Sequence, residues 1–574
     1  MKLLLKYLKP FKWYIAIALT IKTSATLIEL FIPYIMSHIL DNVVPEKEIP
    51  SILLWGAAMI LCALLACMGN IIANRMAART AKNSTRGIRH DLFTKIMSLS
   101  SAQVDKFTIP SLESRLTSDT YHLHHIVGMS MRMGVRAPIL LIGGIIMTFS
   151  MDPALALIML IISPFIALTV IFISRKGIPL FKRTQSSLDA MTRIVREDAQ
   201  GIRVIKALSK TDYEKRKFDE SNKTLVSCEK KAGTTMAVSN PTVTFLLHLG
   251  LVLVIVAGAV RVRANMTAPG TIVAFIQYFT LISNAMMALA RIFVNSTKAM
   301  ASASRINEVI NTESDLCIES EEKYPPVSTD SFISFDKVSF SYLGKKNNLD
   351  NISLELNRGQ SLGIIGATGS GKTTLLQLLM RFYDTDEGNI RINGRDVRTI
   401  PHEELNSMFG VVMQNDFIFV GSIADNIKFG RDISDEDMRR GAAVAQAAEF
   451  IEDFEDSYDH ALQSKGTNLS GGQRQRLLIS RALAGSPEIL ILDDASSALD
   501  YKTDAKLRRA IRESFSVITT IVVAQRVSSV MNCDKIIVLD EGRIIGKGRH
   551  EELLESCLIY REISDSQIGG AIIE

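Results

Sequence analysis

The sequence lacks the cysteine spacing of a metal site or of a disulfide framework. Its six cysteines are scattered through 574 residues, and two of them, Cys62 and Cys67, lie within an apolar run. None of the short spacings typical of zinc ligands occurs. We therefore expect buried or incidental thiols in a reducing compartment.

The sequence also lacks a strong net charge and a cleavable signal peptide. Its 65 basic and 60 acidic side chains leave a formal charge of only +5, and we expect no nucleic-acid partner. The first residues, "MKLLLKYLKPFKWY", are basic and amphipathic but contain no small-residue cleavage site. We expect them to form an interfacial helix on the cytoplasmic membrane surface.

Long apolar runs are abundant in the first 300 residues. A helix needs roughly 20 apolar residues to cross a bilayer. Six runs qualify: residues 14–39, 51–73, 125–149, 153–173, 238–261 and 271–297. Two segments between them, about 74–124 and 174–237, are long, basic and helical in pattern, so they should extend membrane helices beyond the lipid. Because basic segments stay on the cytoplasmic side, a multi-pass protein of the cytoplasmic membrane with both termini in the cytoplasm is predicted.

The rest of the chain has the composition of an ordinary α/β domain. Residues 301–330 are polar and acidic and include a Pro-Pro pair, as expected of a linker. Beyond them, buried β-branched segments alternate with helical ones, which is typical of a nucleotide-binding α/β domain. The sequence thus predicts an all-α six-helix membrane domain over residues 1–300, a linker over 301–330, and a nucleotide-binding domain over 331–574.

A phosphate-binding loop stands between a predicted strand and a predicted helix. "GATGSGKTT" matches G-x-x-x-x-G-K-[ST], follows "SLGII" and precedes "TTLLQLLMRF", which is the context that the motif requires. Glycines allow backbone N–H groups to surround phosphates, and the helix N-terminus adds positive potential. The predicted cofactor-binding residues are Gly366, Ala367, Thr368, Gly369, Ser370, Gly371, Lys372, Thr373 and Thr374. Lys372 should contact the β- and γ-phosphates of ATP, and Thr373 should hold Mg²⁺, which Asp493 at the end of "EILILDD" also faces.

Further motifs carry a family resemblance. "LSGGQRQRLLISRALA" resembles the signature sequence of ATP-binding-cassette (ABC) proteins. Tyr342 resembles the aromatic residue that stacks on adenine, and "SALD" (Ser497–Asp500) resembles the D-loop. Gln414 resembles the glutamine that reaches Mg²⁺ and the attacking water. With six spans before this domain, the whole chain resembles a bacterial ABC exporter half-transporter of the type I architecture.

The resemblance implies an ATPase coupled to transport, with ATP and Mg²⁺ as cofactors. Two cassettes are expected to dimerise head to tail, so that each ATP lies between one chain's phosphate loop and the other chain's signature. This chain would offer the partner's ATP Ser470, Gly471, Gly472 and Gln473 at the start of a helix. Two coupling helices are expected near Ser114–Leu123 and Gly201–Lys210.

Two residues depart from the family pattern, both around this chain's own ATP. Asp494 stands where the family has the glutamate that acts as general base for water, and Gln525 stands where it has histidine. Asp494 alone is open to a tolerated substitution, but glutamine cannot relay a proton as imidazole can. The pair resembles the degenerate-site subunit of heterodimeric multidrug exporters. We therefore expect a slow or inactive own site and a partner half-transporter with glutamate and histidine.

Charged residues in the predicted spans are candidates for a substrate cavity. Lys22 and Glu29 lie seven residues apart on one helical face, and Arg132 and Arg291 lie in later spans. Charges at membrane depth usually face protein or water. The alternative is structural, with Lys22 ion-paired to Glu29 or a neighbour and the arginines bonded to backbone carbonyls. Arg136 favours the structural interpretation, because "RAPILLIGG" resembles a common stretch of these transporters.

The predicted function is ATP-driven efflux of amphipathic small molecules, lipids or peptides. No peptidase domain precedes the first span, which argues against a leader-cleaving peptide exporter. Two alternatives stay open: an ABC-type sensor or regulatory membrane module, and a homodimeric lipid or peptide exporter. Fusion of cassette and spans argues against an importer.

Overall fold

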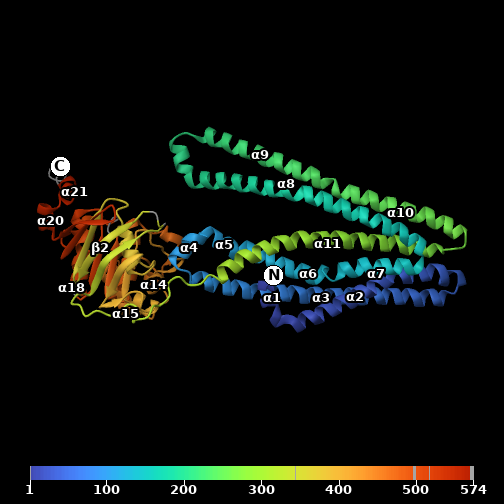
Figure 1. The fold of residues 1–574 in the computed structure, drawn as a ribbon, viewed down its shortest axis with the longest axis horizontal. Coiled ribbons are helices and arrows are strands. Elements are labelled where there is room, and N and C mark those ends of the chain that lie inside the picture. The colour runs from blue at the N-terminus through green and yellow to red at the C-terminus, as the bar shows by residue number, and fades with distance from the viewer. Residues whose placement is uncertain (1, 343, 345, 496–498, 516, 569–574) are drawn as a thin grey trace. The chain divides into compact units, whose positions relative to one another are not determined.

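The chain divides into two structural units (Figure 1). The computed structural model describes residues 2–342, 344, 346–495, 499–515 and 517–568. The first unit comprises Met1–Ser98 and Phe107–Thr312, and the second comprises Leu99–Lys106 and Glu313–Glu574. A short segment from the first third of the chain therefore belongs with the C-terminal domain.

Helices alone build the first unit. They are α1 (Lys2–Leu8), α2 (Lys12–His38), α3 (Ile49–Met97), α5 (Ile109–Ser114), α6 (Thr120–Met133), α7 (Arg136–Met151), α8 (Pro153–Ala207), α9 (Thr211–Ala237), α10 (Ser239–Arg263) and α11 (Pro269–Ile310), with short η1 (Lys9–Phe11), η2 (Ile39–Val43), η3 (Val44–Glu46) and η4 (Arg115–Asp119) between them. In this region, six continuous helical stretches of the described residues are long and apolar enough to cross a membrane, as predicted. The chain is thus a multi-pass membrane protein.

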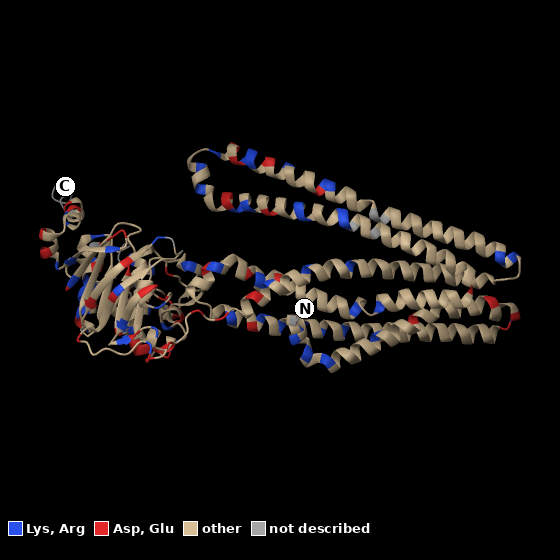
Figure 2. Cartoon of the chain, in the orientation of Figure 1, with Lys and Arg blue, Asp and Glu red and all other residues tan. Residues whose placement is uncertain are grey.

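The long helices continue well beyond a bilayer. α8 has 55 residues, which at a rise of 1.5 Å per residue makes it about 80 Å long, whereas the hydrocarbon core is about 30 Å thick. Lys, Arg, Asp and Glu gather towards helix ends and extensions, and long central stretches carry few of them (Figure 2). Within the unit, α8 packs along α9 and α10, and α10 also packs on α11. The helical extensions predicted at residues 74–124 and 174–237 are therefore present.

The second unit is an α/β domain with one segment added from the N-terminal part. Its strands are β1 (Ile333–Phe340), β2 (Leu349–Leu356), β3 (Ser361–Gly366), β4 (Glu387–Ile392), β5 (Arg395–Asp396), β6 (Phe409–Val412), β7 (Gly421–Ser422), β8 (Ala461–Leu462), β9 (Ile489–Asp493), β10 (Thr519–Val523), β11 (Lys535–Asp540) and β12 (Arg543–Gly548). Its helices are α4 (Ser101–Phe107), α12 (Lys372–Leu379), α13 (His402–Ser407), α14 (Ile423–Lys428), α15 (Asp435–Val444), α16 (Ala448–Glu452), α17 (Gly471–Leu483), α18 (Tyr501–Ser514), α19 (Val527–Val530), α20 (His550–Ser556) and α21 (Leu558–Ile568).

Strand order brings the functional segments together. The larger sheet runs β12-β11-β3-β10-β9-β6, and every pairing except β11 with β12 is parallel. The carboxyl ends of β3, β10, β9 and β6 therefore lie at one edge, where ligands of α/β sheets bind. A second sheet, β2-β1-β4-β5, is antiparallel.

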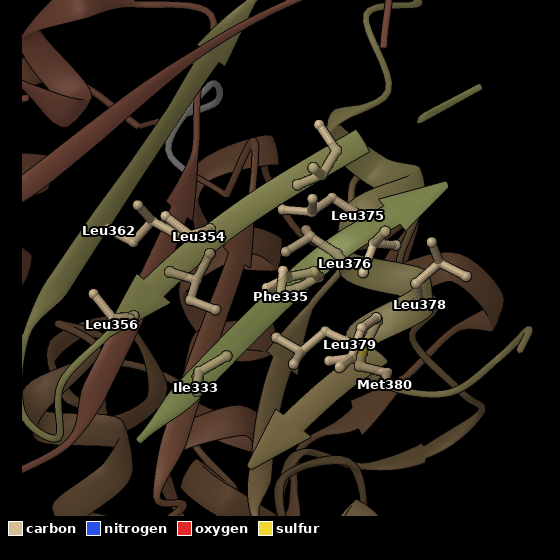
Figure 3. Packing of buried hydrophobic residues seen from close by; sticks show 14 of the residues in the cluster. Ile333, Phe335, Leu354, Leu356, Leu362, Leu375, Leu376, Leu378, Leu379 and Met380 are labelled. Carbon is tan, nitrogen blue, oxygen red and sulfur yellow. The ribbon is translucent and has the colours of Figure 1, made fainter. Parts of the chain in front are cut away.

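The helix behind the phosphate loop is held by a continuous apolar core. Leu375, Leu376 and Leu379 of α12 pack with Phe335 of β1 and Leu354 of β2 (Figure 3). The same cluster includes Leu362 and Ile364 of β3, the strand that leads into the loop. Burying each large apolar side chain contributes roughly 1.5–3 kcal/mol, so both ends of the loop are firmly placed.

The segment between the membrane helices and the domain is shorter than its composition indicates. α11 continues to Ile310, so the first ten residues of the predicted 301–330 linker are helical. Further on, the Cys317 carbonyl accepts a 2.6 Å hydrogen bond from Arg381, and Arg398 stacks on the Tyr324 ring at 3.8 Å. Much of the remaining segment is therefore bound to the domain surface.

Candidate nucleotide-binding site

Four parallel strands deliver the predicted site residues to one cavity. The phosphate loop follows β3, and Gln525 follows β10. Asp493 ends β9, Asp494 follows it, and Gln414 follows β6. The cavity has a volume of about 220 Å³. It is lined by Asn348, Thr368, Gly369, Gly371, Lys372, Thr373, Thr374, Gln414, Asp493, Asp494, Val523, Ala524 and Gln525.

The loop glycines are required by close backbone approach and by backbone conformation. A Cβ atom on Gly366 would lie 2.1 Å from the Leu539 carbonyl oxygen of the neighbouring strand. Gly371 has a φ of 100°, in the left-handed region that favours glycine. These residues let the chain turn from β3 into α12 with its N–H groups towards the cavity.

Lys372 and Thr373 lie where phosphate and metal chemistry requires them. The Lys372 ammonium donates to the Gly366 carbonyl at 2.9 Å and to that of Ala367 at 2.8 Å, which holds it along the loop. Burial lowers the pKa of Lys372, and the charges of Asp493 and Asp494 oppose that effect. The Thr373 hydroxyl donates to Asp493 at 3.1 Å, so hydroxyl and carboxylate oxygens are paired as a hard cation prefers.

The residues present fit ATP with Mg²⁺. Asp493 is buried, which raises its pKa, while the hydrogen bond from Thr373 lowers it. Among the buried side-chain nitrogen and oxygen atoms of the described residues, the Ser370 hydroxyl in the loop is one of few without a hydrogen-bond partner. A phosphate oxygen would satisfy that group, and a divalent cation would offset the burial of Asp493.

The two departures from the family pattern touch each other. The Gln525 side-chain amide donates to the Asp494 carboxylate at 3.4 Å, and the Asp494 N–H donates to the Val523 carbonyl at 2.9 Å. Burial raises the pKa of Asp494, and the charges of Arg526 and Lys372 oppose that effect. Gln567 of α21 donates to the Gln525 carbonyl at 2.8 Å and fixes the segment.

Tyr342 lies beside the cavity rather than in its lining. Its hydroxyl bonds Gln377 at 2.5 Å and Thr374 at 3.2 Å, and its ring meets Phe340 and Tyr383 edge to face. Asn348, which lines the cavity and accepts from the Tyr342 N–H at 3.2 Å, was not predicted from the sequence. Asn348 lies in the turn before β2 and belongs to no sequence motif. Only the fold therefore shows that it lines the cavity.

The signature residues are absent from this cavity lining. Ser470 caps α17, its hydroxyl accepting from the Gln473 N–H at 3.2 Å, while the Gln473 side chain accepts from the Ser470 N–H at 2.9 Å. Gly471 and Gly472 form the first turn of that helix. In the D-loop, Ser496, Ser497 and Ala498 lie outside the described residues, and Asp500 caps α18.

A helix from the membrane half of the sequence docks on the cassette. α4 lies within the second unit, and the Tyr383 hydroxyl donates to Asp105 at 2.7 Å. The Gln103 amide donates to the Glu313 carbonyl at 2.6 Å. α4 precedes Ser114–Leu123, near which the first coupling helix is predicted, and the sequence alone did not predict its contacts with Tyr383 and Glu313.

The structure separates the membrane charges into two pairings. Lys22 is 4% exposed and donates to Asn70 at 2.6 Å and Asn74 at 3.1 Å, both on α3. Glu29 instead accepts a two-pronged contact from Arg136, at 2.6 and 3.2 Å. The structural alternative was therefore wrong in pairing Lys22 with Glu29.

The predicted arginines Arg132 and Arg291 are both exposed. Arg132 donates from Nε to the Gly128 carbonyl at 3.1 Å, as the structural alternative expected. No side-chain hydrogen bond or ion pair of Arg291 is found in the described part of the chain.

Volume alone does not identify the site. A larger cavity of about 370 Å³ lies between α18 and the sheet, and its lining mixes apolar residues with polar ones such as Asp504, Arg508 and Arg512. It contains none of the residues predicted to bind ATP or Mg²⁺. The chemistry of the smaller cavity, with its loop, lysine and carboxylates, decides the assignment.

The fold and the site together define a multi-pass membrane protein fused to a P-loop nucleotide-binding domain. Comparison with known proteins agrees. Residues 15–286 match the ABC transporter transmembrane region, and residues 349–497 match the ABC transporter domain. The chain belongs to the ABC transporter family and is an exporter half-transporter, with six membrane helices and one ATP-binding domain whose ATPase activity is coupled to transport.

Similar proteins match over nearly the whole chain. The uncharacterized ABC transporter ATP-binding protein YfiB of Bacillus subtilis (strain 168) is 34% identical over 98% of each chain. The uncharacterized ABC transporter ATP-binding protein Rv1273c of Mycobacterium tuberculosis is 33% identical over 100% of this chain and 99% of its own. A solved bacterial Atm1-family ABC exporter with ATP bound has a TM-score of 0.81 at 22% identity, covering 96% of this chain and 98% of that one, and shows the same fold.

Removal of the loop lysine tests the site directly. We expect Lys372→Ala to weaken photolabelling of this chain by azido-ATP by about tenfold or more, because a charge-assisted contact to phosphate is lost. The matched control Lys346→Ala, an exposed change outside the cavity lining, should label normally. Equal labelling of Lys372→Ala and the native chain would contradict the assignment.

The docking of α4 makes a separate prediction. Tyr383→Phe removes the hydrogen bond to Asp105, and we expect amide exchange in α4 to quicken about fivefold, equivalent to about 1 kcal/mol of local stability. Hydrogen exchange read by mass spectrometry measures this, with the exposed Tyr213→Phe as control. Unchanged exchange in α4 would mean that other contacts hold the helix.

Proposed function

We propose that this chain is one half of a heterodimeric exporter of amphipathic small molecules, lipids or peptides. Its own ATP site is slow or inactive, and its signature completes the competent site of a partner with glutamate and histidine. The observation that carries the proposal is the contact between Gln525 and Asp494 at the end of β10 and β9. Both positions that activate water in the family are altered, and they are altered at one place.

The chemistry of this pair argues against fast hydrolysis. The carboxylate of Asp494 is one methylene shorter than that of glutamate, and an ångström-scale misplacement costs about 100-fold in rate. Gln525 donates a hydrogen bond to that carboxylate, so one of its oxygens is already engaged. An amide neither takes up nor releases a proton at neutral pH, so no proton relay replaces imidazole.

Binding of nucleotide, by contrast, is supported by the rest of the cavity. Lys372 and the loop N–H groups would bind phosphates, Thr373, Asp493 and Gln414 would face Mg²⁺, and Tyr342 would meet adenine on rotating from its present contacts. Mg²⁺ supplies charge neutralisation when bound. A site that binds ATP and barely hydrolyses it keeps the cassette dimer closed for longer.

The signature supports a role in a partner's site. Ser470, Gly471 and Gly472 form a well-capped helix N-terminus that lies outside this chain's own cavity lining. Ser470 and Gly471 are exposed, and Gly472 is half-buried. Such an N-terminus suits an anion, here the γ-phosphate of the partner's ATP. An intact signature beside an altered own site is the asymmetry that a heterodimer uses.

The extension of α8 beyond the predicted span is rich in basic residues, among them Lys182, Arg183 and Arg193. The basic character of the same extension supports a cytoplasmic location, and with it cytoplasmic termini.

A sensor or regulatory module is the second candidate, because a slow ATP site would suit it. The exposed signature favours transport, since a sensor needs no second catalytic site. The test is ATP-dependent dye efflux from proteoliposomes containing this chain with a glutamate- and histidine-bearing partner. We expect efflux with the pair and little ATPase activity with this chain alone; full activity of the single chain would overturn the heterodimer, and ligand-dependent ATPase without dye movement would favour the sensor.

A further inference from the structure

Charges in the membrane helices are unevenly balanced. Lys22, Arg132, Arg136 and Arg291 all lie in predicted spans, and Glu29 is the carboxylate among them. Arg136 takes both oxygens of Glu29. α2, which carries Lys22 and Glu29, packs against α6, which carries Arg132, and against α7, which carries Arg136. The cluster therefore has a clear excess of positive charge.

Two of these cations are satisfied by neutral groups alone. Lys22 donates to the amide oxygens of Asn70 and Asn74, and Arg132 donates to a backbone carbonyl. No ion pair to Lys22, Arg132 or Arg291 occurs among the residues that the structure describes. An uncompensated charge at membrane depth is costly and usually marks a substrate or ion path.

Helix register places Arg132 and Arg291 at one level. The Asn295 amide of α11 contacts the Met129 sulfur of α6 at 3.7 Å, and Ser302 of α11 donates to Asp119 at 2.8 Å, so the two helices run antiparallel. Arg291 lies four residues back from Asn295 and Arg132 three residues on from Met129. At a rise of 1.5 Å per residue these are displacements of about 6 and 4.5 Å in the same direction.

The three cations Lys22, Arg132 and Arg291 differ in how far their side chains are exposed. Lys22 is 4% exposed, so it acts through its charge rather than by direct contact. Arg132 and Arg291 are exposed, and their guanidinium groups present forked donors that match carboxylate, sulfonate or phosphate oxygens. The surrounding span residues are apolar, which suits the rest of an amphipathic molecule.

We propose that Arg132 and Arg291, with Lys22 behind them, bind the anionic group of an amphipathic substrate. The inference rests on the proposed export function and names its substrate class: organic anions with an apolar body. The same chemistry is offered by a soluble anionic drug and by an anionic lipid headgroup.

The experiment uses the heterodimer in phosphatidylcholine proteoliposomes, with cassettes facing outwards. ATP-dependent uptake is measured for a fluorescein-type anionic dye and for the cationic dye rhodamine 6G, and flipping is measured for a labelled phosphatidylglycerol. We expect the anionic dye to be taken up and the cation excluded. Flipping of the lipid without dye uptake assigns the site to headgroups.

Variants distinguish binding from scaffolding. Arg132→Gln and Arg291→Gln should each raise the half-saturating anion concentration about tenfold or more. Arg132→Lys keeps the charge but loses the forked donors, so its half-saturating concentration should lie between those of the native chain and Arg132→Gln. Glu29→Gln should lower the half-saturating concentration, because it frees Arg136, whereas a purely structural role predicts no such gain. Arg193→Gln, the same change on an exposed residue outside the spans, is the control.

The possible results distinguish failure of the anion site from failure of the proposed export function. Preference for the cation, or anion uptake that Arg132→Gln leaves unaltered, overturns the anion site and leaves export standing. Absence of ATP-dependent movement of every probe overturns the proposed heterodimeric efflux of amphipathic molecules.

Discussion

Hydrolysis at this chain's own site is expected to rise about 100-fold in the double variant Asp494→Glu with Gln525→His. The glutamate carboxylate reaches one methylene further towards the attacking water, and a misplacement of about 1 Å accounts for roughly that factor. Histidine at position 525 removes the amide that now donates to the carboxylate at 3.4 Å and supplies a titratable group in its place.

The hydrolysis rates of the heterodimer's two ATP sites must be measured separately. Single-turnover hydrolysis of radiolabelled ATP is followed in the heterodimer whose partner carries glutamine in place of its catalytic glutamate. The hydrolysis rate that remains then comes from this chain's site alone. Each single change should recover less than the pair, because base and histidine act on one water. An unchanged rate would place the defect in the partner's signature instead.

ATPase activity of the heterodimer is expected to fall about 100-fold in the variant Gly472→Asp. Gly472 lies in the first turn of α17, where a carboxylate suits the helix dipole and does not threaten folding. The same carboxylate would face the partner's γ-phosphate and replace attraction by repulsion. Loss of one preorganised donor to a developing charge already costs about 10²–10³-fold.

Nucleotide binding at this chain's own site serves as the internal control for Gly472→Asp. Azido-ATP labelling at Lys372's cavity should persist in Gly472→Asp, since α17 contributes no residue to that cavity lining. Gly233→Asp makes the same change on α9, where an added Cβ meets nothing within 4 Å, and should leave ATPase activity intact. A heterodimer that keeps full activity with Gly472→Asp would exclude the head-to-tail site.

Local chemistry explains which features were predictable. The phosphate loop needs glycines, a lysine and a hydroxyl at set spacing, so Gly366–Thr374 could be assigned before any fold was known. Membrane spans follow from the length of apolar runs, and all six were found. The linker was less predictable: residues 301–310 are polar, yet their helix simply continues.

Contacts between distant residues were beyond local chemistry. Lys22 and Glu29 share a helical face, but their partners come from other helices, and the pairing between them was wrong. The bonds of α4 to Tyr383 and Glu313 were not predicted, because these partners lie more than 200 residues away along the chain.

The amino-acid sequence by itself determined the class of protein. It did so through six spans, a phosphate loop, a signature, and the altered residues Asp494 and Gln525. Each of these rests on residue type and near spacing, which short-range physics constrains. Only the tertiary structure decided that Gln525 touches Asp494, because β9 and β10 are adjacent parallel strands whose ends meet. It alone showed that, among the described residues, no carboxylate forms an ion pair with Arg132 or Arg291, since ion pairing depends on which helices pack together.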